Sequence, residues 1–120
     1  MTKLFAVLAA CAIATGAQAG TVVCGGTITY LAFHAPNTFM IQMSSMNTPV
    51  FFCNPETTFS VPGTTYTTGP STCKTLYASF LAIKASGGSI SGIYFDGDDT
   101  PATCDTWGGW KSANIRYFAF

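Results

Sequence analysis

A single helical pattern stands among strand-like ones, and it limits the folds that this chain can adopt. Residues 71–88 (STCKTLYASFLAIKASGG) carry apolar side chains at three- and four-residue spacing, which predicts a helix with one buried stripe. Pro70 or Ser71 can open this helix, and Ser71 or Thr72 is a suitable N-cap. Gly87 can supply the left-handed residue that ends it. The predicted buried stripe consists of Cys73, Leu76, Tyr77, Phe80 and Ile83.

β-rich runs flank the predicted helix on both sides. Two of them lie before and after Ala35-Pro36-Asn37, a turn sequence, so they predict a hairpin. A third run follows the hairpin, and two more follow the helix. The segments 56–70 and 96–109 are rich in polar residues and glycine and are predicted to be loops, the first with room for a short strand at 58–61. The predicted strands are 27–33, 38–43, 50–53, 89–95 and 115–120.

The order of these elements indicates the fold class. Three strands, one helix and two strands follow one another, as in an OB-fold barrel, where the helix covers one end. The sequence therefore predicts a β-rich α+β domain, a small five-stranded OB-like barrel with one helix between its third and fourth strands. A small α+β sandwich is the alternative.

The first residues predict export of the chain. Lys3 supplies a positive charge, residues 4–14 are apolar, and Ala17-Gln18-Ala19 is a small-residue cleavage site, so residues 1–19 are interpreted as a secretory signal peptide. The apolar run is shorter than the roughly 20 residues that a membrane span needs. Leu8-Ala9-Ala10-Cys11 is similar to a bacterial lipobox, and a lipidated Cys11 is the alternative. We expect a secreted or periplasmic protein.

Four cysteines remain in the predicted single exported domain, residues 20–120. An even number in such a domain predicts two disulfides, which four cysteines can form in three connectivities. The spacing fits no zinc site, because no C-x-x-C pair occurs and the sequence has one histidine. In an OB-like barrel the first strand runs antiparallel to the fourth, so Cys24 and Cys104 should lie close together. Cys53, at the end of the third strand, would then pair with Cys73 in the first turn of the helix.

The charge pattern argues against several classes of partner. The chain has five basic and five acidic residues, and removal of Lys3 with the signal peptide leaves four basic ones. A near-neutral domain without a basic cluster does not favour nucleic acid or an anionic membrane surface. We expect no cofactor.

Catalytic and metal sites have little support in the sequence. His34 is the only histidine, and it precedes Ala35-Pro36, where a turn residue is expected rather than a general base. No G-x-S-x-G motif occurs and the cysteines are expected to be oxidised, so we predict that the protein is not an enzyme. Asp96-Gly97-Asp98-Asp99 offers oxygen ligands for calcium but lacks the EF-hand glutamate, which favours a solvated turn and leaves calcium binding open.

The predicted ligand surface is built on the motif Trp107-Gly108-Gly109-Trp110. Aromatic faces stack on the apolar faces of sugars, and neighbouring polar side chains could supply hydrogen bonds. The alternative is that one tryptophan packs on a Cys24–Cys104 bridge while the other covers the end of the barrel. The candidate ligand-binding residues are Trp107, Trp110, Asp105 and Asn114, with Thr106 as a further polar neighbour.

The back of the predicted helix carries small residues where charged ones are expected. Thr75, Ala78, Ala82 and Ala85 form a stripe at helical spacing, which permits close approach by another element. The stripe is a candidate oligomer face, while the alternative is an exposed face rich in alanine, the best helix former.

Short motifs resemble the B subunits of subtilase-cytotoxin-like AB5 toxins. The matching pieces are Gly26-Thr27-Ile28-Thr29, Phe51-Phe52-Cys53, Thr75-Leu76-Tyr77 and Ile93-Tyr94-Phe95, within about residues 24–97. The resemblance implies a small exported OB-fold protein that forms pentamers and binds cell-surface glycans. The family's sugar-contacting residues do not carry over, because the segments before Thr27 and after Gly97 depart from its pattern.

A second resemblance, to a wider set of small exported bacterial proteins, rests on Lys84-Ala85-Ser86-Gly87 before a strand and on Cys104 before the last strand. The sequence thus favours an exported, non-enzymatic binding module, with glycan as the candidate ligand. The alternative is a structural or interaction protein of the bacterial envelope without a small-molecule ligand.

Overall fold

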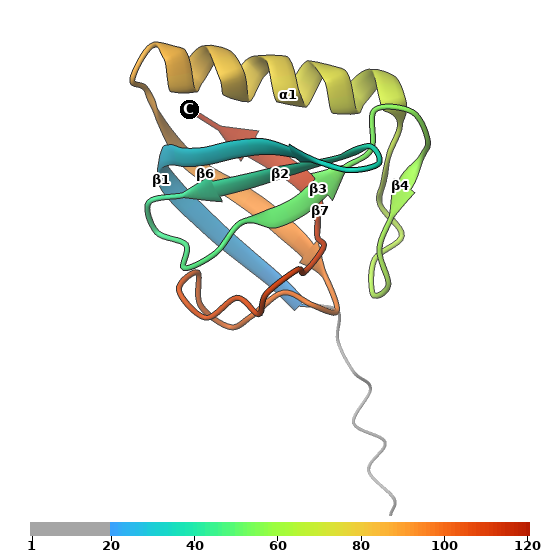
Figure 1. The fold of residues 1–120 in the computed structure, drawn as a ribbon. Coiled ribbons are helices and arrows are strands. Elements are labelled where there is room, and N and C mark those ends of the chain that lie inside the picture. Colours follow the sequence, from blue (N-terminus) through green and yellow to red (C-terminus); the bar gives the residue numbers. More distant parts are fainter. Residues whose placement is uncertain (1–19) are drawn as a thin grey trace, which may run out of the picture.

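Five strands form one antiparallel sheet in the order β3-β2-β1-β6-β7 (Figure 1). The structure is a computed structural model and describes residues 20–120, so the predicted signal peptide and Cys11 lie outside the described residues. The fold class is confirmed as β-rich with one helix between the third and fourth strands of this sheet. The elements are β1 Gly20–His34, β2 Thr38–Met43, β3 Val50–Cys53, β4 Phe59–Ser60, β5 Thr67–Thr68, α1 Pro70–Ala85, β6 Ser89–Gly97 and β7 Asn114–Ala119.

The first strand is longer than predicted and is shared by two halves of the sheet. Its N-terminal half pairs with β6 and its C-terminal half with β2. The predicted start of this strand at residue 27 is wrong, because β1 begins at Gly20 and Gly25-Gly26 form a bulge inside it, where the register to β6 shifts. Gly26 has a φ of 114°, and a Cβ there would collide with the side chain of Ser44. Cys24 therefore lies within the strand.

The sheet is open at its edges within residues 20–120. The edge strands β3 and β7 are not joined by a ladder, and one parallel bridge, Phe51 to Ser112, connects the two sides. Two backbone hydrogen bonds support it: Phe51 N donates to Lys111 O (2.9 Å), and Ala113 N donates to Phe51 O (3.0 Å). The sheet is therefore strongly curved without being a closed barrel.

Helix α1 crosses one end of the curved sheet (Figure 1). The predicted N-cap at Ser71 or Thr72 is wrong: the cap is Gly69, and Pro70 occupies the first turn, where its missing N–H is not needed. At the other end Gly87 has a φ of 71° and donates to Lys84 O, while Gly88 N donates to Ile83 O. These are the two hydrogen bonds of a Schellman motif, so the predicted glycine ending is confirmed. Among the described residues, no helix is long and apolar enough to cross a membrane.

The inner face of α1 closes the core. Phe80 is fully buried and packs edge-on against Phe52 and Phe118, with ring centroids 5.5 and 5.1 Å apart. Tyr77 stacks on Phe39 at 4.1 Å. Five apolar side chains of the helix therefore face inward as predicted, three of them buried and two partly buried: Cys73, Leu76, Tyr77, Phe80 and Ile83.

Two disulfides join distant parts of the chain. Cys24–Cys104 links β1 to the loop before β7, and Cys53–Cys73 links the end of β3 to the first turn of α1. This is the pairing that the strand order favours. Both bridges contribute to stability in the usual model by restricting the unfolded chain, and the longer loop contributes more.

A two-stranded ribbon was not predicted in full. The expected strand at 58–61 is reduced to β4, which pairs with β5 in a segment predicted to be loop. The ribbon is held to the sheet through Asn114, which is fully buried. Its Oδ1 accepts from Thr68 Oγ1 (3.0 Å) and its Nδ2 donates to Tyr66 O. No sequence pattern indicated this contact, because 46 residues separate Thr68 from Asn114.

Candidate ligand-binding site

Three aromatic rings from distant segments meet at the surface. The ring centroids of His34 and Trp110 are 5.1 Å apart, those of His34 and Phe51 are 5.5 Å apart, and those of Phe51 and Trp110 are 6.0 Å apart. Trp110 is nevertheless 69% exposed. We call His34, Phe51 and Trp110 the Trp110 surface. The indole of Trp110 is exposed to solvent while Phe51 stacks beside it and His34 meets it edge-on.

The loop that carries Trp110 is anchored on both sides of it. On the N-terminal side, the amide of Asn47 donates to Trp107 O and accepts from Trp107 N, both at 2.8 Å. On the C-terminal side, the parallel bridge ties the segment after Trp110 to Phe51. Gly108 and Gly109 lie between the two anchors, so Trp110 projects from a short, constrained turn.

The backbone of Trp110 adopts a rare conformation. Its φ is 59°, in the left-handed region that bulky L-residues seldom occupy. Such conformations persist where surrounding contacts determine them, and they cluster at ligand-binding and active sites. The anchors and the rings of His34 and Phe51 are contacts of this kind, and they place the indole at the surface.

A small cavity adjoins the exposed indole. Its volume is about 180 Å³, below the roughly 300 Å³ of a typical enclosed ligand pocket. Thr48 supplies one hydroxyl group, and the remaining lining is apolar or backbone. A ligand would place one group in the cavity and rest its body on Trp110. The lining residues are Met40, Thr48, Pro49, Gly109 and Trp110.

Trp107 does not share this surface. Its side chain is 3% exposed and packs edge-on against Phe95 with centroids 5.5 Å apart. Its Nε1 is buried without a hydrogen-bond partner among the described residues. The two tryptophans of the motif therefore do not lie on one face, since Trp107 is buried and Trp110 is exposed.

The polar candidates also separate. Asn114 is fully buried, and its side-chain amide is hydrogen-bonded to Thr68 Oγ1 and Tyr66 O. Asp105 is exposed, and its carboxylate forms no hydrogen bond or ion pair with another residue of the described chain. Thr106 hydrogen-bonds within its own turn, to Thr103. Only Trp110 of the four candidate residues joins the aromatic surface.

The acidic residues at the end of β6 and directly after it contact different partners. Asp96 is buried and accepts from Thr21 Oγ1 at 2.6 Å, whereas Asp99 lies 3.7 Å from Lys111 Nζ. Asp98 packs beside Gly63. Across residues 20–120, no group of three or more acidic, histidine or cysteine side chains is arranged to hold a metal ion.

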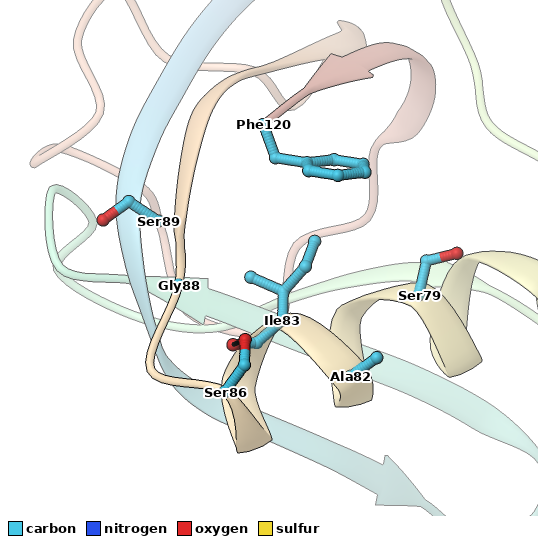
Figure 2. Close-up of a pocket in the computed structure, with 7 residues that line it drawn as sticks. All are labelled: Ser79, Ala82, Ile83, Ser86, Gly88, Ser89 and Phe120. Carbon is cyan, nitrogen blue, oxygen red and sulfur yellow. Dashed lines mark hydrogen bonds between the residues drawn. The ribbon is translucent and has the colours of Figure 1, made fainter.

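The small-residue back of α1 faces solvent. Thr75, Ala78, Ala82 and Ala85 are all exposed. An open groove of about 530 Å³ adjoins this face, and Figure 2 shows the ring of Phe120 directed over Ile83 of the helix. The groove is lined by Ser79, Ala82, Ile83, Ser86, Gly88, Ser89 and Phe120.

His34 and Phe51 were missed as partners of Trp110. His34 was predicted to be a turn residue, and its Nδ1 does lie 2.7 Å from Ala35 O at the end of β1. Phe51 carried a usable signal, since consecutive residues of a strand face opposite sides. In Phe51-Phe52, one ring must therefore point away from the core, and that ring is Phe51.

Comparisons with known proteins give no family for this chain: no protein-family model, no curated protein and no solved structure matches it.

Proposed function

We propose that this protein is an exported, non-enzymatic binding module that recognises glycans through the Trp110 surface. The observation that carries the proposal is a tryptophan that is 69% exposed yet held by two neighbouring rings and two loop anchors. Exposing so large an apolar side chain is unfavourable unless a partner covers it. Conformational preorganisation of this kind lowers the cost of binding.

The chemistry of the surface suits a sugar. The apolar face of a pyranose can stack on the indole, and its hydroxyl groups need polar partners at the edge. Thr48 and His34 supply such groups beside Trp110. The Trp110 surface carries no carboxylate or ammonium group of its own, so a neutral sugar fits it best.

The location and the finer fold belong to the same proposal. Two disulfides are typical of proteins from oxidising compartments, which supports export by a signal peptide at residues 1–19 and a secreted or periplasmic location. The strand order and the bridge between β3 and the segment before β7 support an OB-like barrel that is incompletely closed. The resemblance to AB5 toxin B subunits leads to the same fold and the same class of ligand.

A glycan array on the oxidised protein tests the proposal. We expect neutral glycans to bind, and Trp110→Ala to weaken binding at least about tenfold, as expected for an aromatic hot spot. Phe33→Ala is the matched control, because Phe33 is also an exposed aromatic residue, adjacent to His34 on β1 but directed to the other face of the strand. An array without any bound glycan, or equal binding by Trp110→Ala and wild type, would rule the proposal out.

A second candidate function, an interaction protein without a small ligand, is favoured by the groove beside α1. Ala78, Ala82 and Ala85 leave room for a close neighbour, and Phe120 exposes a large apolar ring. Helices that meet across a symmetric interface, as in a pentamer, would cover this face. Ala82→Glu would then place like charges together in every copy, so light scattering should show a fall to monomers while both disulfides persist. A monomeric wild type at all concentrations would exclude the assembly.

A further inference from the structure

A second aromatic cluster, on β6, β7 and the ribbon, surrounds an arginine. The guanidinium carbon Cζ of Arg116 lies 5.5 Å from the ring centroid of Tyr94 and 5.9 Å from that of Tyr66. Tyr117 packs edge-on against Tyr94 at 5.6 Å. Tyr66 and Tyr117 are each more than half exposed. We call Tyr66, Tyr94, Arg116 and Tyr117 the Arg116 cluster.

The fold builds this cluster with a bulge and a clamp. Tyr94 pairs with Tyr117, and Phe95 pairs with Ile115, so Arg116 is an extra residue in the β6–β7 ladder. Bulges of this kind redirect a side chain and are common next to functional sites. Tyr66 comes from the ribbon, and the hydrogen bond from Asn114 Nδ2 to Tyr66 O fixes its backbone beside β7.

The guanidinium group is only partly used by the protein. Its Nε lies 3.3 Å from Asp96 Oδ2, and the Arg116 side chain remains 39% exposed. Asp96 is 4% exposed, and its other oxygen accepts from Thr21 Oγ1. The terminal nitrogens of Arg116 have no hydrogen-bond partner within residues 20–120, and such a planar fork binds two oxygens of a carboxylate or of a tetrahedral oxyanion in bidentate fashion.

The orientation of this fork is set before any ligand arrives. Tyr66 and Tyr94 restrict the guanidinium by cation–π contacts, and Asp96 restrains the Nε edge. The Asp96 charge balances that of Arg116, so attraction for an anion comes from directed hydrogen bonds rather than from a wide positive field. Exposed tyrosine rings beside the fork add an apolar surface on which a sugar ring can rest.

We propose that the Arg116 cluster is a second binding site, which takes an acidic sugar. The carboxylate or sulfate group would accept hydrogen bonds from the Arg116 terminal nitrogens, and the sugar ring would lie against Tyr117 and Tyr66. This inference rests on the proposed glycan-binding function and extends it, because the Trp110 surface has no comparable group for an anion.

Chemical-shift titration of the isotope-labelled, oxidised protein tests the site. The probes are glucuronate, glucose 6-sulfate and methyl glucoside at matched ionic strength. We expect one or both acidic sugars, but not methyl glucoside, to shift the resonances of Tyr66, Arg116 and Tyr117. Shifts with glucuronate identify a carboxylate as the bound anion, and shifts with glucose 6-sulfate identify a sulfate. Equal shifts with methyl glucoside, or none with either acid, would overturn the proposal.

Two variants separate a binding role from a structural one. Arg116→Lys retains a positive charge near Asp96 but loses the planar fork, so we expect at least about tenfold weaker binding of the acidic sugar. Tyr117→Ala removes an exposed ring and leaves the Asp96–Arg116 pair in place, so it remains informative should Arg116→Lys fail to fold. Lys74→Gln removes an exposed cation on α1 and is the control for nonspecific attraction of the acidic sugar, so it should leave binding unchanged. Unchanged binding in Tyr117→Ala and in folded Arg116→Lys would refute the site.

The same titration distinguishes this inference from the proposed function. Suppose that a neutral glycan binds in a manner that depends on Trp110, and that the acidic sugars do not shift the resonances of the Arg116 cluster. This result would sustain the proposed function and reject the second site. If acidic sugars shift the resonances of the Arg116 cluster while no neutral glycan binds at Trp110, glycan binding by the Trp110 surface is rejected. Binding of an acidic sugar by the Arg116 cluster is then retained.

Discussion

Trp107 and Trp110 are three residues apart and differ completely in environment. Trp107 is 3% exposed and packs in the core, whereas Trp110 is 69% exposed. Both lie in one loop beside the same two glycines. The difference shows that a tryptophan motif does not by itself define a binding face, because the burial of each side chain depends on the residues that contact it in the folded structure.

The neighbours that decide are remote in sequence. Trp107 is fixed by Asn47, 60 residues earlier, and by the ring of Phe95. Trp110 is turned outward by its left-handed backbone and is held by Phe51 and His34. One tryptophan therefore contributes mainly to stability, and the other is free to contribute to binding.

Removal of the buried Trp107 ring should destabilise the protein most. Trp107→Ala should lower the free energy of unfolding by about 3–5 kcal/mol, because it leaves a cavity in the core. Denaturant unfolding of the oxidised protein measures the change. Trp107→Phe keeps most of the packing and removes the unpaired Nε1, so it should cost clearly less than Trp107→Ala. A loss below about 1 kcal/mol in Trp107→Ala would contradict the buried placement.

The next effect comes from releasing the loop that carries both tryptophans. Cys24→Ala combined with Cys104→Ala removes the bridge that joins this loop to β1, and should cost about 2–4 kcal/mol. Thermal or denaturant unfolding gives the value. Peptide mapping without reduction should recover Cys53–Cys73 in the variant, and a scrambled pairing would show that the two bridges do not form independently.

A smaller effect isolates the clamp on Trp107. Asn47→Ala removes both hydrogen bonds to the Trp107 backbone and should cost about 1–2 kcal/mol. Asn47→Asp retains the acceptor for Trp107 N and loses the donor to Trp107 O, so its stability should fall between those of wild type and Asn47→Ala. Hydrogen exchange at Trp107 N provides the local measurement. Unchanged exchange in Asn47→Ala would mean that Phe95 packing alone holds the residue.

The smallest expected effect on stability completes the comparison. Trp110→Ala should change the free energy of unfolding by less than about 0.5 kcal/mol, as exposed substitutions usually do. Trp110→Gly should be at least as stable as Trp110→Ala, because glycine adopts the left-handed conformation without steric cost. Denaturant unfolding of both variants tests this. A large loss in either would show that Trp110 is a structural residue.

Much of the fold could be predicted from local patterns. The helical periodicity, the Gly87 ending and the five main strands all came from spacing and turn residues near to one another in the chain. The ribbon and the Gly69 cap could not be predicted in this way. Thr67-Thr68 is too short to carry a strand pattern, and Pro70 displaced the expected serine or threonine cap by fitting the first turn itself.

The candidate site was predicted only in part. The sequence identified Trp110 as an aromatic residue in a glycine-containing loop, where surface exposure is common. It gave no means to join Trp110 to His34 and Phe51, or Arg116 to Tyr66 and Tyr94. These groups meet because β1, β3, β6 and β7 bring distant residues into register.

The kinds of element, their order and the disulfide pairing that this order favours follow from local patterns in the chain. Backbone propensity, side-chain periodicity and turn chemistry act over a few residues, so they can be recognised in the chain. Packing between distant segments sets which tryptophan is buried, brings Asn114 into hydrogen bonds with Thr68 and Tyr66, and places Arg116 against two tyrosine rings. Those outcomes depend on packing between residues far apart in the chain, such as Asn47 with Trp107 and His34 with Trp110, and packing is fixed only when the whole sheet has formed.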